Sequence, residues 1–258
     1  MFSLSLLAFA LAADPAPKKV EFTVGETKRE TLIAVPEKPG KSIPLLFAFH
    51  GHGGTMNHAS RTMNFQKHWP EAICVYMQGL NTPGKITDPE GKKPGWQTAA
   101  GDQDDRDLKF FDEVLKKIKA DYPIDEKQIF CTGHSNGGAF TYTLWANRGD
   151  VFAAVAPSAG MSTTEMKNLK AKPCLHIAGE KDPLVKFAWQ EATMKKVEKL
   201  NGCDEKGKEW AKEGKLVGSK YESKGGTPFI SLIGPGGHEF PDEAPKLIVK
   251  FFQEQVKK

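Results

Sequence analysis

Two kinds of hydrophobic pattern alternate along this chain. Short continuous apolar runs bounded by turn residues are typical of strands that are buried on both faces. Longer stretches repeat apolar residues at three- and four-residue spacing, which indicates amphipathic helices; in the first of them, Asp107 can cap a helix whose apolar face includes Leu108 and Phe111. We expect buried strands over 43–49, 71–77, 128–132, 152–159, 173–178 and 228–233, and helices over 107–122, 189–200 and 242–256.

Strands that alternate with helices imply a mostly parallel central sheet with helices on both faces. Ahead of them, strand-like segments at 20–24 and 30–35 flank Gly25-Glu26 and predict an antiparallel hairpin at the sheet edge. No internal repeat or interdomain linker interrupts the pattern. The sequence therefore predicts a single α/β domain over 13–258, whose ligand should lie beyond the carboxyl ends of the strands.

The first twelve residues differ from the rest of the chain. They form an apolar run that ends in Ala10-Leu11-Ala12, the small-residue pattern of a signal-peptide cleavage site, although no Lys or Arg precedes the run. The run is too short to cross a bilayer as a helix. We therefore expect a signal peptide over 1–12 and a secreted or periplasmic protein without stable membrane association after processing.

Composition narrows the function classes. The formal charge of +4 is small, and only four of the 36 basic residues are arginine, the side chain preferred for reading phosphates and bases. The lysines are interspersed with acidic residues, as on solvated surfaces, so no nucleic-acid partner is expected. The four cysteines form no C-x-x-C pair, so neither a zinc knuckle nor a thioredoxin-type site is indicated.

A pentapeptide between a predicted strand and a predicted helix carries the clearest chemical signal. Gly133-His134-Ser135-Asn136-Gly137 fits G-x-S-x-G, and strand, motif and helix together form the setting of a nucleophile elbow. Glycines flank the serine because a Cβ there would collide with the neighbouring strand and helix. A serine hydroxyl becomes a good nucleophile only beside a base, and acyl transfer also needs an acid behind the base and an oxyanion site.

In this architecture the acid and then the base follow the serine along the chain. His238 follows the glycine-rich loop 234–237, from which it can reach a neighbouring strand end, and it is the candidate base. Asp182, after the strand at 173–178, is the preferred acid; Glu180 is a rival, and turn formation before a proline is the structural alternative. His176 is expected to be packed inside its strand, and His134 to point away from the serine.

Two backbone N–H groups are candidates for the oxyanion site. One belongs to Asn136, directly after the nucleophile. The other belongs to His52 in the loop 50–54, where glycines let the backbone approach a substrate oxygen closely. His50, His52 and His58 are a competing metal site, but no cysteine or carboxylate lies at ligand spacing nearby, so no metal or other cofactor is expected.

A single tryptophan stands in the polar segment 81–103, which is expected to be a long surface loop. Trp96 is either an exposed platform for a substrate ring or an anchor that pins the loop to the body of the protein. The sequence leaves both interpretations open, and Trp96 is the candidate substrate-binding residue.

Several motifs follow one another in order: His50-Gly51-His52-Gly53-Gly54, Trp96, 107–110, 122–125, 132–138, 152–157, 182–183, 201–203 and 236–241. In this combination they resemble the secreted esterase family that groups polyhydroxybutyrate depolymerases with feruloyl and acetylxylan esterases. The resemblance covers nearly the whole mature chain and implies the α/β-hydrolase fold. It also implies Ser135, Asp182 and His238 as the triad, with His52 and Asn136 at the oxyanion site.

Three departures from the family pattern change the expectations. Segment 221–226 lacks the cysteine that usually pairs with the one matching Cys203, so Cys203 is expected to be a free thiol. Glu239 and Phe240 stand where Thr and Trp usually follow the base. Extracellular polyester depolymerases often carry a separate substrate-binding module, which these 258 residues do not show, so attack on solid polyhydroxybutyrate is not expected.

The sequence thus predicts a monomeric serine carboxylic-ester hydrolase that forms an acyl-enzyme, with feruloyl or acetyl esters of plant-wall polysaccharide as substrates. A polyester depolymerase is the alternative within this class. A peptidase or dienelactone hydrolase on the same fold and a non-catalytic binding protein are alternatives from other classes. A serine rather than a cysteine at position 135 argues against the lactone enzyme, and the complete set of triad candidates argues against the binding protein.

Glu239, directly after the candidate base, generates a first prediction. A carboxylate beside a base stabilises the protonated form of that base. The pH optimum of ester hydrolysis should therefore lie higher in the wild type than in Glu239→Gln. Profiles of kcat/KM against pH with one aryl ester test this, and superimposable profiles would contradict it.

Overall fold

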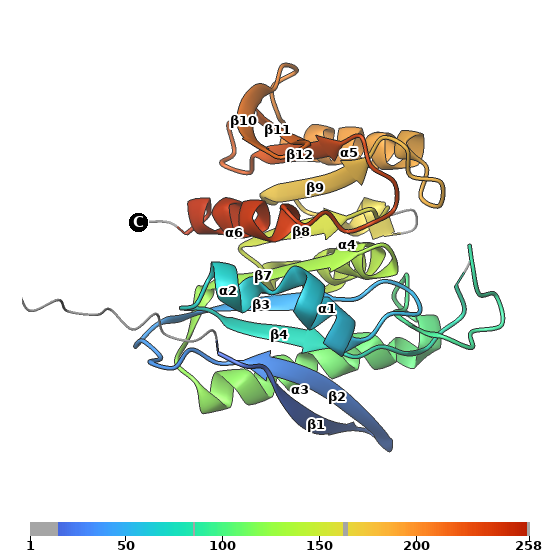
Figure 1. Cartoon of the computed structure of the whole chain (residues 1–258), viewed down its shortest axis with the longest axis vertical. Coiled ribbons are helices and arrows are strands. Elements are labelled where there is room, and N and C mark those ends of the chain that lie inside the picture. The colour runs from blue at the N-terminus through green and yellow to red at the C-terminus, as the bar shows by residue number, and fades with distance from the viewer. Residues whose placement is uncertain (1–14, 85, 162–164, 257–258) are drawn as a thin grey trace, which may run out of the picture.

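A computed structural model describes residues 15–84, 86–161 and 165–256 (Figure 1). The predicted signal peptide, 1–12, lies outside the described residues. In the described part, ten strands form one sheet in the order β1-β2-β4-β3-β7-β8-β9-β12-β11-β10. No helix among these residues has the length and hydrophobicity needed to cross a bilayer.

The elements have the following bounds. The strands of the sheet are β1 (Lys18–Val24), β2 (Thr27–Ala34), β3 (Ile43–Phe49), β4 (Ile73–Met77), β7 (Ile124–His134), β8 (Ala154–Ser158), β9 (Cys174–Gly179), β10 (Lys208–Glu213), β11 (Leu216–Tyr221) and β12 (Phe229–Gly234). A separate two-stranded ribbon pairs β5 (Leu80–Asn81) with β6 (Pro94–Gly95). The helices are α1 (Met56–Met63), α2 (Phe65–His68), α3 (Arg106–Asp121), α4 (Asn136–Arg148), α5 (Phe187–Asn201) and α6 (Ala244–Glu254), with 3-10 turns at Asp102–Asp105, Gly149–Val151 and Glu165–Asn168.

The centre of the sheet is parallel, as the continuous apolar runs predict. Strands β4, β3, β7, β8, β9 and β12 pair parallel to one another, and β1 and β2 form the expected antiparallel hairpin at one edge. The other edge carries a second antiparallel pair, β10 and β11, which was not predicted from the sequence. Its lysines and glutamates are mostly exposed, so the segment has the composition of a surface loop.

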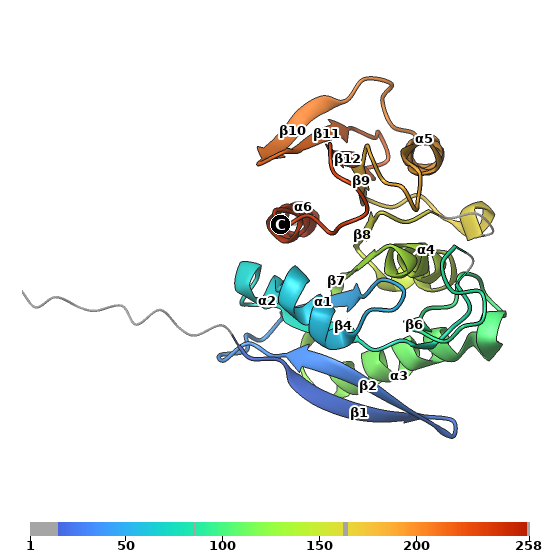
Figure 2. The same cartoon turned by 45° about the vertical axis from the view of Figure 1, so that its right-hand side comes forward.

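Helices cover both faces of the sheet, and Figure 2 shows them as two layers. Helices α3, α4 and α5 pack on one face, and α1, α2 and α6 on the other. Side chains of one strand point alternately to the two faces, so a strand covered on both sides is apolar at every position. In β3, Leu45 and Phe47 belong to the first core, and Leu46 and Ala48 to the second.

Helices α1 and α2 were not predicted from the sequence. Helix α1 is short and amphipathic, and the side chain of Thr55 caps it by accepting the N–H of His58. Asn64, in the left-handed conformation, separates it from α2. Both helices are too short for a clear periodic signal, which explains the omission.

Asp107 does not cap α3, contrary to the prediction. The side-chain oxygen of Gln97 accepts the N–H groups of Asp107 and Leu108 at the start of the helix. The carboxylate of Asp107 instead accepts the Gln97 N–H at 2.9 Å and an Arg29 N–H at 2.8 Å. Asp107 therefore ties the loop before α3 to strand β2.

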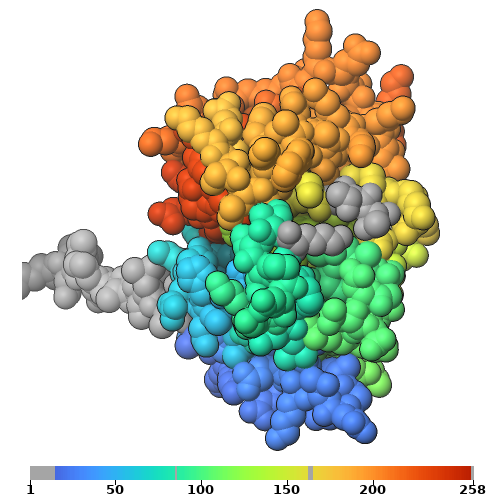
Figure 3. Space-filling view, turned by 90° about the vertical axis from the view of Figure 1, so that its right-hand side faces the viewer, coloured from blue at the N-terminus to red at the C-terminus, as the bar shows by residue number. Residues whose placement is uncertain are grey.

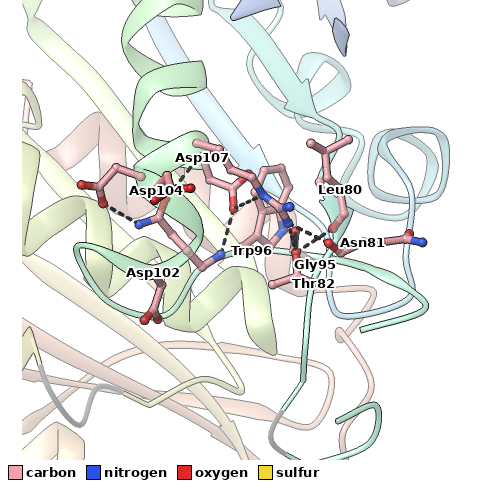
Figure 4. A network of polar contacts seen from close by, with 12 residues as sticks. Leu80, Asn81, Thr82, Gly95, Trp96, Asp102, Asp104 and Asp107 are labelled. Atoms are coloured by element: carbon pink, nitrogen blue, oxygen red, sulfur yellow. Dashed lines mark hydrogen bonds and ion pairs between the residues drawn. The ribbon is translucent and has the colours of Figure 1, made fainter. Parts of the chain in front are cut away.

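The described residues of segment 81–103 lie mostly at the surface, as predicted, and hydrogen bonds hold the base of the segment. The Thr82 hydroxyl donates to the carbonyl oxygens of Leu80 and Gly95, at 2.7 and 3.1 Å, across the small ribbon (Figure 4). Arg106 donates to the carbonyl oxygen of Asn81 at 2.8 Å. These bonds give the segment a defined backbone next to the carboxyl ends of the strands.

Cys203 is a free thiol, as expected from the sequence. It forms an isolated antiparallel bridge with Ser223, the position facing it in the segment that lacks a cysteine. Burial raises the pKa of the Cys203 thiol to about 11.

The ion pair between Arg29 and Asp107 generates a stability prediction. Both side chains are almost fully buried, and Arg29 also lies over the Phe110 ring at 4.2 Å from its centroid. Removing one partner leaves the other charge buried without compensation, so Arg29→Met should lower the free energy of unfolding by about 3–5 kcal/mol. Urea denaturation measures the loss. Lys19→Met, which removes an exposed pair with Glu30, is the control, and an equal loss in the two variants would refute the prediction.

Candidate active site

Ser135 lies on a sharp turn between β7 and α4. Its backbone has φ 57° and ψ −117°, a conformation that L-residues rarely adopt. The Ser135 N–H donates to the carbonyl oxygen of Ser158 at 2.8 Å, which fixes the turn against the end of β8. The turn lifts the hydroxyl of Ser135 out of the strand and into a cavity beyond the sheet edge.

The glycines around Ser135 are required by backbone contacts. A Cβ on Gly133 would lie 2.3 Å from the carbonyl oxygen of Gly137. A Cβ on Gly137 would lie 2.3 Å from the carbonyl oxygen of Phe49, at the end of β3. Helix α4 therefore starts in direct backbone contact with the neighbouring strand, as the motif predicts.

Three side chains from distant parts of the chain meet at this turn. His238 Nε2 lies 2.7 Å from Ser135 Oγ, and His238 Nδ1 lies 2.7 Å from Asp182 Oδ2. The backbone N–H groups of Leu184 and Val185 donate to Asp182 Oδ1 at 2.8 and 2.9 Å. The structure thus places Asp182, rather than its rival Glu180, behind His238.

The loop that carries the predicted oxyanion donor is held from several sides. His50 Nδ1 donates to the Gly51 carbonyl oxygen at 2.7 Å, and His50 Nε2 accepts the Gly79 N–H at 2.9 Å. Burial lowers the pKa of His50 to about 4, so the ring is neutral at neutral pH. His52 Nε2 lies 3.0 Å from Asp88 Oδ2, and Gly53 N–H donates to the Pro94 carbonyl oxygen at 2.7 Å.

The competing metal site is not assembled. The rings of His50 and His52 are engaged with Gly79 and Asp88 rather than directed at a common point. Over the described ranges, no group of three or more His, Cys, Asp and Glu side chains is placed to hold a metal ion.

A cavity of about 720 Å³ opens in front of Ser135. Its lining includes the loop 51–55, Asn136 and His238. One wall contains Pro83, Gly84, Ile86, Thr87 and Lys93, which belong to the blue-green stretch of the space-filling view (Figure 3). Another part of the wall is apolar and contains Leu184 and Val185. The cavity is large enough for a small organic ligand.

Comparisons with known proteins agree with the α/β fold. A model of the prolyl oligopeptidase family matches residues 95–177. A probable feruloyl esterase C of Aspergillus clavatus is 27% identical over 221 residues, which cover 84% of this chain and 77% of the relative. A bifunctional acetylxylan esterase/xylanase of Neocallimastix patriciarum is 24% identical over 65% of this chain and 23% of the relative. The solved acetyl xylan esterase of Aspergillus awamori matches with a TM-score of 0.66 at 15% identity, over 92% of this chain and 99% of that one.

The chain is an α/β-hydrolase related to feruloyl and acetylxylan esterases. It is a carboxylic ester hydrolase. The segment that matches the prolyl oligopeptidase model contains Ser135 but ends before Asp182 and His238. The similarity to the prolyl oligopeptidase family therefore includes the turn that carries Ser135, but not the candidate acid Asp182 or the candidate base His238.

Trp96 does not have the position of a substrate platform in this esterase. Its side chain is fully buried, stacks on Phe140 at 5.2 Å between ring centroids, and donates its indole N–H to the His50 carbonyl oxygen at 2.8 Å. Its backbone N–H and carbonyl oxygen bond to the side-chain amide of Asn136. The structure overturns the substrate-binding prediction in favour of the anchor, because the indole fits the apolar gap between β3 and α4.

His134 does not point away from the site, contrary to the prediction. It lines the cavity together with Ser135, and its ring lies 5.1 Å from that of His238 and 5.7 Å from that of Phe240, between centroids. Burial lowers the pKa of His134 to about 4. A neutral ring thus packs beside the candidate base.

A buried chain of hydrogen bonds extends from Asp182 into the core. The amide nitrogen of Gln190, in α5, donates to Asp182 Oδ2 at 3.1 Å and to the Val185 carbonyl oxygen at 2.7 Å. Its oxygen consequently faces His176 Nε2, at 3.2 Å, so that nitrogen carries the proton. His176 Nδ1 then accepts the hydroxyl of Tyr142 at 2.8 Å.

The state of His176 agrees with this assignment. Burial lowers its pKa to about 4, so the ring is neutral at neutral pH and has one donor and one acceptor. His176 is packed inside β9, as the sequence indicated. Gln190 was missed, although its place on the buried face of α5 with Met194 and Val197 marks it as a polar residue in an apolar stripe.

Gln190 generates a prediction about the acid side of the pH profile. Its N–H shares Asp182 Oδ2 with His238, so its removal leaves more of the carboxylate's negative charge to His238 and favours the protonated ring. In Gln190→Leu, kcat/KM at neutral pH should fall about tenfold and the acid limb should move to higher pH. Thr193→Val, which removes a polar group from the same helix, is the control. A loss of thermal stability without movement of the acid limb would assign Gln190 a structural role only.

Proposed function

We propose that this esterase cleaves feruloyl or acetyl esters of plant-wall polysaccharide through an acyl-enzyme on Ser135. The observation that carries the proposal is the continuous hydrogen-bonded series Ser135–His238–Asp182, with two contacts of 2.7 Å, at the base of an open cavity. This is the arrangement that nucleophilic catalysis by serine requires.

The residues have the following roles in the proposal. His238 Nε2 takes the proton of Ser135 as its oxygen attacks the ester carbonyl carbon. Asp182 holds the other ring nitrogen and stabilises the positive charge that forms on His238. The backbone N–H groups of His52 and Asn136 receive the developing oxyanion.

Collapse of the tetrahedral intermediate breaks the bond to the alcohol oxygen, which receives the proton from His238. Water then enters, His238 removes its proton, and the resulting hydroxide attacks the acyl-enzyme. When the second intermediate collapses, the bond between the acyl carbon and Ser135 Oγ breaks, Oγ takes the proton back from His238, and the acid is released. No step in this sequence requires a group beyond these side chains, the backbone donors, the ester and water.

The size of the cavity favours the feruloyl group, which is the larger of the two proposed acyl groups. Its volume of about 720 Å³ exceeds the needs of an acetyl group and has room for a substituted phenyl ring with part of a sugar. Leu184 and Val185 supply an apolar wall. The relatives named as feruloyl and acetylxylan esterases support both acyl groups. The predicted secretion agrees with a polymeric substrate outside the cell.

The release of two acids, ferulate and acetate, measured in parallel, tests this proposal. Wild type should release ferulate from methyl ferulate or acetate from acetylated xylan, and Ser135→Ala should lose at least about 10⁴-fold in kcat, because the nucleophile is absent. Ser231→Ala, in β12, is the control for folding. A fluorophosphonate should label the wild type and the control but not Ser135→Ala.

Other outcomes redirect the proposal. Full activity of Ser135→Ala would exclude the assigned nucleophile. Serine-dependent cleavage of aryl esters without release of either acid would exclude these acyl groups and favour a polyester substrate. Faster cleavage of a prolyl anilide than of any ester would favour a peptidase.

A further inference from the structure

We infer that Lys93 is a specificity-determining residue that binds an anionic group, such as a carboxylate, on the ester substrate. The inference rests on the proposed function, because it assumes ester cleavage at Ser135. It concerns a second part of the substrate, away from the bond that breaks.

The backbone of Lys93 is fixed at the cavity wall. Its N–H donates to Asp88 Oδ2 at 2.8 Å, and its carbonyl oxygen accepts the Thr82 N–H at 3.0 Å. The side chain lines the cavity and crosses Gly53, where an added Cβ would lie 3.3 Å from Lys93 Cδ. Lys93 therefore extends across the loop that holds His52, next to the proposed oxyanion site.

The charge of Lys93 is not neutralised by the protein. In the part of the chain that the structure describes, no carboxylate lies within 4.0 Å of its amine, whereas the neighbouring Lys92 pairs with Glu90. Asp88, which does not itself line the cavity, accepts His52 Nε2 and the backbone N–H groups of both lysines. Its carboxylate thus orders the backbone that carries Lys93, and the side chain of Lys93 lines the cavity.

Lys93 is the main cationic side chain among the described residues that line the cavity. Among the described residues that line the cavity, none is aspartate or glutamate, and the other ionisable side chains are histidines. Burial keeps the ring of His134 neutral by lowering its pKa to about 4. An acidic group would therefore meet one ammonium and no opposing carboxylate.

The lining of the cavity contains both polar and apolar side chains. Lys93, Thr87 and His58 supply polar groups, while Met161, Leu184 and Val185 supply apolar surface. An ester with an apolar part and a carboxylate can make contacts of both kinds. Two sources of the carboxylate fit the same chemistry: an acyl group derived from a dicarboxylic acid, and an alcohol part that contains an acidic sugar or an aromatic acid.

Matched pairs of charged and neutral esters test the inference. For the acyl side the pair is the p-nitrophenyl monoester of adipic acid and p-nitrophenyl hexanoate. For the alcohol side the pair is m-acetoxybenzoate and phenyl acetate. The measured quantity is the ratio of kcat/KM for the charged ester to that for its neutral partner, in wild type, Lys93→Met, Lys93→Arg and Lys92→Met.

We expect the ratio of kcat/KM values to fall in Lys93→Met and not in the other two variants. In at least one pair the ratio should fall about ten- to hundredfold in Lys93→Met, because the charge-assisted contact is lost. It should be largely retained in Lys93→Arg, which keeps the charge, and in Lys92→Met. Raising the salt concentration to about 1 M should lower the wild-type ratio, since ions screen an exposed pair.

Two results would overturn the inference, and they are distinguishable. Equal ratios in wild type and Lys93→Met for both pairs, with hydrolysis that depends on Ser135, would reject the anion site and leave the proposed function intact. Absence of any Ser135-dependent ester hydrolysis would reject the proposed function and this inference together.

Discussion

The backbone contact between the start of α4 and the end of β3 is the constraint on which the site depends. Because Gly137 has no side chain, its Cα lies against the carbonyl oxygens of Phe49 and His50. This contact sets the position of Ser135 relative to the loop 50–54, and hence that of the proposed nucleophile relative to the proposed oxyanion donors. A single methyl group at this glycine would separate them.

A second layer of contacts fixes the acid. The Asp182 carboxylate is buried and accepts four hydrogen bonds: two from backbone N–H groups, one from Gln190 and one from His238. Four donors compensate a buried negative charge that would otherwise be costly. Gln190 is in turn fixed by His176, which is bonded to Tyr142 in α4. The helix that begins at the serine therefore also supports the acid, through a path that avoids the cavity.

The segment that runs from β5 through β6 to Gln97 connects the site to the rest of the fold. Trp96 bonds to His50 on one side and to Asn136 on the other, so one buried residue holds both proposed oxyanion segments. The same segment continues to Gln97 and Asp107, where the buried pair with Arg29 anchors it to β2 (Figure 4). This polar segment therefore links the site to the rest of the fold through its buried residues. Its outer part contains Lys93, which lines the cavity.

Local patterns in the sequence predict the parallel sheet, the elbow, and the candidates for nucleophile, acid and base. Apolar runs specify strands buried on both faces, and Gly133 and Gly137 specify a turn that excludes Cβ atoms. The choice of Asp182 over Glu180 and the surroundings of the site follow from the tertiary structure. Whether Trp96 is exposed, whether Asp107 caps a helix, and which groups surround Asp182 depend on residues far apart in the chain. Burial and hydrogen-bond partners are set by that packing, and short-range patterns do not encode it.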